Sequence, residues 1–194
     1  MKKIVFPLIA LIFITLISCK EKKKNSLTTV EKTEEVSPSS ISQEKKEIIV
    51  QLEPKSGSKA VGKLMFIEVD GVVSLAAKFQ RLTPGMHAIH IHEKADCSSI
   101  DGKSAGGHWN PTFKNHGKWG DEGGYHKGDI GNFEIDESGD GKIIMETNEW
   151  CIGCEDDTKN ILGKAIIVHQ GTDDFISQPS GAAGTRIICG GIIL

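Results

Sequence analysis

From residue 47 onward, apolar and polar side chains alternate along short runs that are separated by glycine, proline, asparagine and aspartate. Such alternation is typical of a β-strand with one buried face. No stretch carries the 3.6-residue period of a long amphipathic helix. The pattern therefore predicts an all-β fold, an eight-stranded Greek-key barrel or sandwich with long loops. The predicted strands are residues 47–53, 59–69, 73–82, 86–93, 128–136, 141–148, 163–169 and 185–194.

The connections between these runs are of two kinds. Asp70-Gly71 is a hairpin signal between the second and third runs, and residues 136–141 are another between the fifth and sixth. Residues 93–127 and 170–185 are much longer. Because long loops in a compact domain are usually functional or disordered, we expect the chemistry of this chain in these two segments.

The first residues follow a different pattern. Lys2 and Lys3 precede an apolar run over residues 4–17, which indicates an export signal over residues 1–18. The run is shorter than the roughly 20 residues of a membrane-spanning helix. Its end, Leu16-Ile17-Ser18-Cys19, resembles the lipobox of bacterial lipoproteins, in which the chain is cut before the cysteine and its sulfur carries a diacylglycerol. An ordinary signal peptide with a chance cysteine is the alternative.

Residues 19–46 are charged and rich in serine and threonine, with no sustained apolar period. Such a segment buries too little apolar surface to offset the entropy of ordering it, so we interpret it as a flexible tether. With lipid on Cys19, it would hold a domain of residues 47–194 at a bacterial membrane, in the cell envelope on the periplasmic or cell-surface face.

Charge is divided unevenly between these parts. Residues 47–194 hold 14 Lys and Arg against 21 Asp and Glu, a net charge of −7, whereas residues 1–46 carry +4. A net-acidic domain is a poor ligand for phosphate backbones, and we expect no nucleic-acid partner.

All seven histidines fall between residues 87 and 169. His90 and His92 leave the same face of a strand, although such a pair alone is more typical of surface or core histidines than of metal ligands. The long connection then supplies three imidazoles and a carboxylate, the number and type of a tetrahedral zinc site. These residues are His108, His116, His126 and Asp129. His169 is available as a third imidazole for the first pair, and an all-imidazole site favours copper.

At these residues the chain resembles the copper/zinc superoxide dismutase family, over essentially all of residues 47–194. The motifs are GMHAIHIHE (85–93), GGHWNP (106–111), NHG (115–117), YHKGDIGN (125–132), VHQGTDD (168–174) and GAAGTRIICG (181–190). The resemblance implies that His90, His92, His108 and His169 bind copper, and that His108, His116, His126 and Asp129 bind zinc, with His108 bridging the two metals.

The same resemblance implies the reaction, disproportionation of superoxide to oxygen and hydrogen peroxide. Arg186 matches the arginine that attracts the anion, and Asp173 matches the carboxylate that orients ligands of both metals. Ser180 matches a threonine of the channel wall. His87 points to the other strand face from His90, and the family assigns it a structural hydrogen bond.

The family pattern implies a disulfide between Cys97 and Cys189. Cys151 and Cys154 form a C-x-x-C that the pattern does not supply. Three interpretations stay open: a local structural disulfide, a redox-active or copper-acquiring dithiol, and a free pair without a role.

Two other classes of function compete with the enzyme. A binding protein of the same fold would buffer copper without turnover, and a lipoprotein adhesin or scaffold would act mainly through its tether. Seven apparent ligands together with Arg186 favour the enzyme, because a buffer needs neither a bridged zinc nor an anion-binding arginine. Both a monomer and a homodimer are compatible with the sequence.

Overall fold

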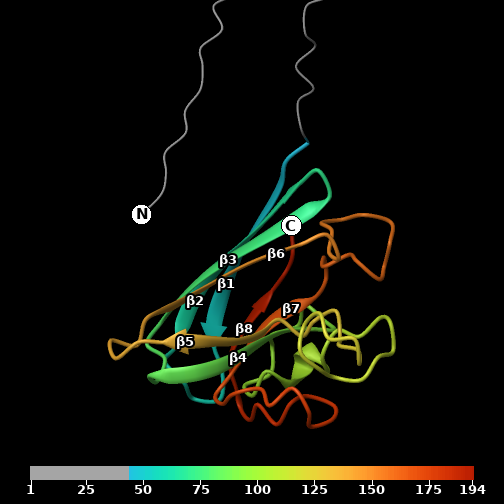
Figure 1. Cartoon of the computed structure of the whole chain (residues 1–194). Coiled ribbons are helices and arrows are strands. Elements are labelled where there is room, and N and C mark those ends of the chain that lie inside the picture. The colour runs from blue at the N-terminus through green and yellow to red at the C-terminus, as the bar shows by residue number, and fades with distance from the viewer. Residues whose placement is uncertain (1–43) are drawn as a thin grey trace, which may run out of the picture. The chain divides into compact units, whose positions relative to one another are not determined.

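The computed structural model describes residues 44–194, which contain eight strands and one short 3-10 helix (Figure 1). The signal segment, Cys19 and nearly all of the tether lie outside the described residues. Within residues 44–194, no helix is long and apolar enough to cross a membrane. The elements are β1 Lys46–Pro54, β2 Val61–Val69, β3 Val72–Gln80, β4 Gly85–His92, η1 Lys103–Ala105, β5 Gly131–Ile135, β6 Gly141–Thr147, β7 Ala165–His169 and β8 Arg186–Gly191.

The strands close into an antiparallel barrel in the order β1-β2-β3-β6-β5-β4-β7-β8. β3 pairs with β6 instead of β4, so the connection from β3 passes β6 and β5 in the sheet before it enters β4, and this order is a Greek key. The predicted all-β barrel of eight strands is therefore confirmed. Closure also leaves no exposed sheet edge in this part of the chain.

Both predicted hairpin turns are present. Asp70 and Gly71 take φ values of 51° and 75° between β2 and β3, the left-handed pair that a two-residue hairpin needs. Between β5 and β6, the amide of Asp136 donates to the carbonyl of Asp140 over 2.9 Å. The left-handed positions fall on aspartate and glycine, which tolerate them better than most residues.

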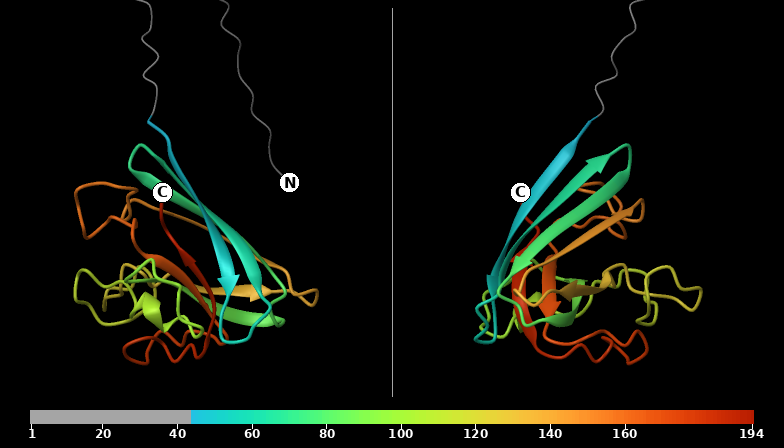
Figure 2. Two further views of the ribbon diagram at one scale, coloured as in Figure 1. Left: turned by 180° about the vertical axis from the view of Figure 1, so that it is seen from behind. Right: turned by 60° about the vertical axis from the view of Figure 1, so that its left-hand side comes forward.

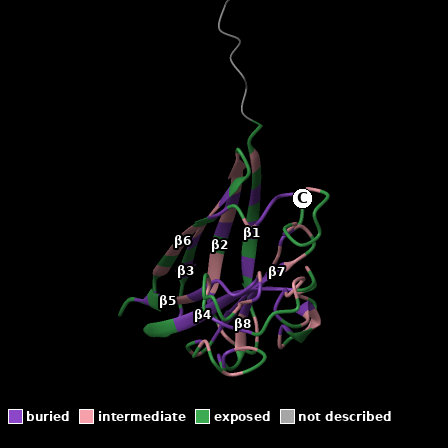
Figure 3. Ribbon diagram, turned by 45° about the vertical axis from the view of Figure 1, so that its right-hand side comes forward, coloured by how far each residue is buried: buried purple, intermediate pink, exposed green. Residues whose placement is uncertain are grey.

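The barrel core follows the alternation in the sequence (Figure 3). In β1 and β3, every second residue is buried. The large apolar side chains Phe66 of β2 and Leu75 and Phe79 of β3 are almost fully enclosed. β4 and β7 differ, because residues 87–92 and all of β7 are buried whichever face they occupy. Residues 93–130 and 170–185 lie against this side of the barrel and cover it (Figures 1 and 2). Histidines on β4 and β7 are thereby held away from bulk water.

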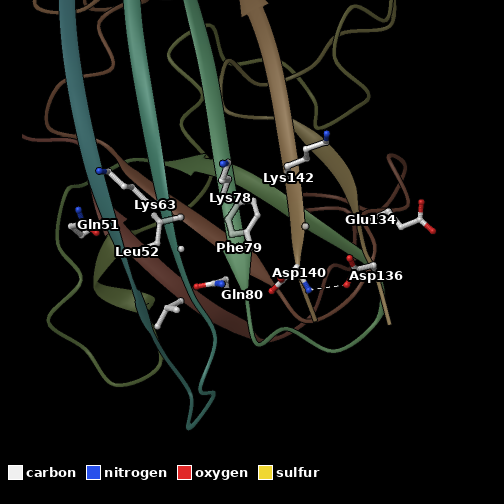
Figure 4. A pocket seen from close by; sticks show the side chains of 13 residues that line it. Gln51, Leu52, Lys63, Lys78, Phe79, Gln80, Glu134, Asp136, Asp140 and Lys142 are labelled. Carbon is white, nitrogen blue, oxygen red and sulfur yellow. Dashed lines mark hydrogen bonds between the residues drawn. The ribbon is translucent and has the colours of Figure 1, made fainter. Parts of the chain in front are cut away.

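A groove of about 1160 Å³ is lined by residues of β1, β2, β3 and β6 and of the turn between β5 and β6 (Figure 4). Lys63, Lys78 and Lys142 stand opposite one another on β2, β3 and β6, and Asp136 and Asp140 lie at the end of the groove. No histidine lines it, so the groove is separate from the centre described next.

Candidate metal centre

Seven side chains from two strands and one long loop meet beside β4 and β7. His90 and His92 come from β4, and His169 ends β7, which pairs with β4. The loop of residues 93–130 supplies His108, His116, His126 and Asp129. An isolated bridge between His92 and His108 fixes the loop to the strand. The fold thus gathers side chains that are up to 79 positions apart in the sequence.

The seven residues form two groups of potential ligand atoms that share His108. His90, His92, His108 and His169 make the first group, and His108, His116, His126 and Asp129 make the second. In each group the ligand atoms all lie within 4.8 Å of one another, and every member is buried. This spacing lets one ion contact all four side chains of a group. Every predicted ligand falls into its expected group.

Six imidazole nitrogens in these groups are buried without a hydrogen-bond partner. They are His90 Nδ1, His92 Nε2, His108 Nε2, His116 Nδ1, His126 Nδ1 and His169 Nε2. The Nδ1 atoms of His116 and His126 lie 3.0 Å and 3.2 Å from Asp129 oxygens, but without hydrogen-bond alignment. A buried polar atom without a partner costs free energy, and native proteins contain few of them. The donor set therefore fits two metal ions that would accept these lone pairs.

The opposite ring nitrogens are held by the surrounding chain. His92 Nδ1 donates to the carbonyl of Gly106 over 2.9 Å, and His169 Nδ1 donates to the carbonyl of Gly184 over 3.1 Å. A carbonyl only accepts, so the proton of each neutral ring sits on Nδ1 and the lone pair on Nε2. The Nε2 atoms are thus prepared for a metal, as outer hydrogen bonds do in established metal sites.

Asp173 links the two groups. Its Oδ2 lies 2.8 Å from His90 Nε2, and its Oδ1 lies 2.8 Å from His116 Nε2. Burial alone would raise the pKa of Asp173, but hydrogen bonds from His116 and His90 hold it well below the usual range. One carboxylate therefore orients a member of each group. Gly181 leaves room for it, since a Cβ there would lie 1.8 Å from Asp173 Oδ1.

In the second group, the pKa values of Asp129 and of its histidine neighbours depend on one another. Burial would raise the pKa of Asp129, but the hydrogen bond from His108 and the close imidazoles of His116 and His126 outweigh burial and lower it far below the ordinary value. Burial lowers the pKa of His116, yet the hydrogen bond to Asp173 and the nearby charge of Asp129 raise it to about 9. A carboxylate that stays ionised at neutral pH suits a zinc ligand.

In the first group, three of the four imidazoles are held neutral. Burial, together with the charge of neighbouring histidines, lowers the pKa of His108 to about 4 and that of His169 to about 3. Burial and then the charge of His108 also lower the pKa of His92 well below its usual value. Because only the neutral ring offers a lone pair to a metal, these rings are ready to bind at neutral pH.

A cavity of about 370 Å³ gives access to the centre. Its wall includes His92, His108, His169, Ser180 and Arg186. The half-buried guanidinium of Arg186 donates from Nη1 to the carbonyl of Gly102 over 2.9 Å, which directs it along the cavity wall. Burial lowers its pKa somewhat, and the charges of Asp101 and Glu93 oppose that shift. The cavity thus presents one fixed positive charge to a small anion.

His87 belongs to neither group. It is 1% exposed, its Nδ1 donates to the carbonyl of His169 over 2.8 Å, and its Nε2 lies 2.8 Å from the carbonyl of Thr83. This arrangement agrees with the structural role expected from the sequence.

Both cysteine pairs of the described chain are bonded. Cys97 joins Cys189 across 92 residues, and Cys151 joins Cys154 within one loop. The first bridge ties the metal-binding loop to β8, close to Arg186 in the sequence. The second identifies the C-x-x-C as a disulfide in this structure.

Sequence reasoning missed the residues that support the ligands. Glu93 lies in the cavity wall near Arg186, and the backbone of Gly128 lies so close to β4 that a Cβ would be 2.2 Å from the carbonyl of Ile91. Glu149 and Trp150, from the loop of residues 148–164, contact the segment around His126. These contacts join segments far apart in sequence, so no local pattern marks them.

Comparisons with known proteins agree with this geometry. The family model for copper/zinc superoxide dismutase matches residues 60–192. The superoxide dismutase-like protein YojM of Bacillus subtilis is 37% identical over 152 residues, covering 74% of each chain. Superoxide dismutase [Cu-Zn] 2 of Aquifex aeolicus is 36% identical over 137 residues, covering 68% of this chain and 78% of its own.

Solved structures give the same result. A double mutant of a superoxide dismutase-like protein from Bacillus subtilis superposes with a TM-score of 0.68 at 37% sequence identity, covering 75% of this chain and 97% of its own. Fold, metal-ligand geometry and sequence matches agree over the same residues. The chain belongs to the copper/zinc superoxide dismutase family.

Proposed function

We propose that this protein disproportionates superoxide to oxygen and hydrogen peroxide at a binuclear site. His90, His92, His108 and His169 would hold copper, and His108, His116, His126 and Asp129 would hold zinc. The observation that carries the proposal is the set of six buried imidazole nitrogens without partners, all within these two groups. Family membership adds to it, because curated relatives are named as copper/zinc superoxide dismutases.

The two metals would divide the chemistry between them. Copper would supply the one-electron exchange with each superoxide, which zinc with its filled d shell cannot do, while zinc would tune the site. His108 is the one side chain common to both groups. It would hold a proton on Nε2 during one half of the cycle and give that proton to the departing peroxide in the other half.

Arg186 would bring the substrate to the site. The domain of residues 47–194 has a net charge of −7, so a superoxide anion meets an unfavourable field over much of its surface. The guanidinium of Arg186 in the cavity wall opposes that field locally and offers N–H donors to a small anion. Ser180 lies in the same wall.

Metal analysis paired with a superoxide assay tests this function. We expect purified protein, after incubation with both metals, to hold one copper and one zinc per chain and to consume superoxide in large excess over its copper. Protein with both metals and no turnover would be a copper-binding protein and would overturn the proposal.

We further propose that the mature chain begins at Cys19, carries lipid there and is tethered by residues 19–46 in the bacterial cell envelope. The basis is the lipobox resemblance of residues 16–19. Mass spectrometry of the protein from its native membrane should find a diacylglycerol-modified N-terminal cysteine. An unlipidated mature N-terminus would refute the anchor without touching the metal chemistry.

A further inference from the structure

The loop of residues 148–164, between β6 and β7, contacts the metal-binding loop although it supplies no metal ligand (Figure 1). It contains the Cys151–Cys154 disulfide. Its first residues, Glu149 and Trp150, reach the turn that carries His126. The loop is therefore placed to control how firmly that turn is held.

Glu149 accepts hydrogen bonds from the residues on both sides of His126 in this turn. Its Oε1 accepts a hydrogen bond from the hydroxyl of Tyr125 over 2.7 Å, and its Oε2 accepts one from the ammonium of Lys127. The Lys127–Glu149 pair is mostly shielded, with side-chain exposures of 17% and 31%. One carboxylate thus fixes both neighbours of a ligand in the second metal group.

Trp150 supplies the second contact. Its indole N–H donates to the carbonyl of Lys127 over 2.8 Å, and the side chain is 1% exposed. The ring packs edge-on against Phe66 of the barrel core at 6.1 Å and against Trp119 of the metal-binding loop at 5.2 Å. Trp150 therefore joins the core to that loop.

The disulfide begins at the residue after Trp150. The backbone of Ile152, inside the bridge, donates to Glu68 Oε2 over 2.7 Å and accepts from Lys46 Nζ over 3.1 Å. These contacts attach the bridged turn to β1 and β2. Closing Cys151 to Cys154 limits the conformations of this turn, and so limits the freedom of the two residues before it.

We infer that the Cys151–Cys154 disulfide is a positioning element for the second metal group and makes zinc retention dependent on the oxidation state of this pair. Glu149 and Trp150 transmit the constraint to residues 125–127 and hence to His126. The inference rests on the proposed function, in that it takes zinc as the occupant of that group. With the bridge open, the turn would move more freely and zinc would leave faster.

A dithiol is the reductant that the inference requires. Cys154 is half-buried, whereas Cys151 is only 6% exposed, so a reductant thiolate would attack Cys154 Sγ. The bond between the two protein sulfurs breaks, and its electron pair leaves on Cys151 Sγ, which takes up a proton. The second thiol of the reductant then displaces Cys154, which leaves two protein thiols and the reductant as a disulfide.

The first test compares zinc release from the fully metal-loaded protein and from the Cys151→Ser/Cys154→Ser variant, using a chromogenic chelator. We expect roughly tenfold faster zinc release from the variant, the scale seen when support of a metal ligand is lost. Copper release should change far less, because His90, His92 and His169 lie on β4 and β7 and not in the turn of residues 125–127. The matched control, Asp157→Asn, lies exposed in the same loop and should release zinc like wild type.

A second variant keeps the disulfide and removes the hydrogen bonds between Glu149 and the turn of residues 125–127. Glu149→Ala should also speed zinc release several-fold. Glu149→Gln keeps one acceptor oxygen for Tyr125 but loses the ion pair with Lys127, so it should release zinc at a rate between those of wild type and Glu149→Ala. A dithiol added to wild type should accelerate zinc release. It should cause no further acceleration in the Cys151→Ser/Cys154→Ser variant, where Cys97–Cys189 is the bridge that remains.

Failure of the proposed function and failure of the positioning role would give different results. Wild-type protein that binds no zinc would contradict the proposed function. Zinc that binds to wild type and leaves the double-serine variant and Glu149→Ala at the wild-type rate would overturn the positioning role while leaving the proposed function intact. Equal loss of zinc and copper from the double-serine variant would also overturn it, because a general unfolding would then be the cause.

Discussion

Four imidazoles at the centre each have one ring nitrogen bonded to the surrounding chain and one left free. Gly106 and Gly184 accept from His92 and His169 through backbone carbonyls, and Asp173 accepts from His90 and His116. The free nitrogens face the shared space of their groups. Individual hydrogen bonds thus decide which nitrogen can bind a metal before any metal arrives.

Substitution of Arg186 should separate attraction of the substrate from the chemistry. We expect Arg186→Gln to lower the rate of superoxide consumption about tenfold at low salt, because one fixed charge in a cavity raises anion association by at least that factor. Its metal content should equal that of wild type. Stopped-flow rates across a range of ionic strength measure this, and the variant should lose most of the salt dependence of wild type. Equal rates in the two proteins would exclude Arg186 from guidance.

The neutral histidines give the metal-free protein a definite pH dependence. His108 and His169 stay unprotonated when folded down to about pH 4 and about pH 3. In the unfolded chain they take up protons below about pH 6.5, so acidification from there favours unfolding. Each such group lowers the free energy of unfolding by up to about 1.4 kcal/mol per pH unit in this window. His116, whose pKa is raised to about 9, acts oppositely, and its stabilisation is lost between about pH 6.5 and that value.

Urea unfolding of chelator-treated protein from pH 4 to pH 9 measures this dependence. We expect the greatest stability near pH 6.5, and a shallower acidic slope in His169→Gln. A free energy of unfolding that stays constant between pH 4 and pH 6.5 would show that these rings are protonated in the folded protein.

The sequence predicts the strands of this chain better than it predicts the contacts between distant segments. Period-2 alternation was sufficient to predict all eight strands. β1 over Lys46–Pro54 extends one residue beyond the prediction at each end, and β6 over Gly141–Thr147 ends one residue before it. The two groups of potential ligands were predicted from the resemblance of their motifs to a known family, and the structure brings the ligand atoms of each group within 4.8 Å of one another. Two features were not predicted, because both depend on contacts between distant segments. They are the pairing of β3 with β6 and the hydrogen bonds from Tyr125 and Lys127 to Glu149.

A steric change in the loop of residues 170–185 should disturb both metal groups through Asp173. Gly181→Ala places a Cβ 1.8 Å from Asp173 Oδ1 and 2.6 Å from His116 Nε2, so the carboxylate must move. We expect zinc affinity to fall by about tenfold to a hundredfold in competition with a chelator. Gly163→Ala is the control, since Gly163 has a similar φ of +77° and nothing within 4 Å of the added Cβ. Equal zinc affinity in the two variants would exclude this contact as a cause.

At the scale of the molecule, the barrel is a rigid frame and the centre lies on one side of it. β7 pairs with β4 and with β8, whose first residue is Arg186, and Cys97–Cys189 ties the loop of residues 93–130 to β8. The net charge of −7 on residues 47–194 makes the single guanidinium in the cavity more important than it would be in a basic domain. The fold therefore supplies burial and spacing, and a few side chains supply the electrostatics.

Metal binding should stabilise the whole domain, because the two groups join β4, β7 and the long loop. Ligand binding to the native state alone raises the free energy of unfolding by about 4 kcal/mol at a thousandfold excess over Kd. We expect the protein loaded with copper and zinc to unfold at a clearly higher temperature than the chelator-treated protein in calorimetry. His87→Gln, outside both groups, should retain the full increase on metal addition. Identical unfolding temperatures with and without metals would contradict the two-group arrangement.

The most direct test of the central claim is the stoichiometry of the reaction of metal-loaded protein with superoxide. Catalytic disproportionation predicts that one hydrogen peroxide and one oxygen form for every two superoxide anions, over many turnovers per copper. Pulse radiolysis for superoxide, with peroxide and oxygen electrodes, measures all three. Superoxide consumption that stops at the copper content of the sample, or one hydrogen peroxide for each superoxide, would contradict the account.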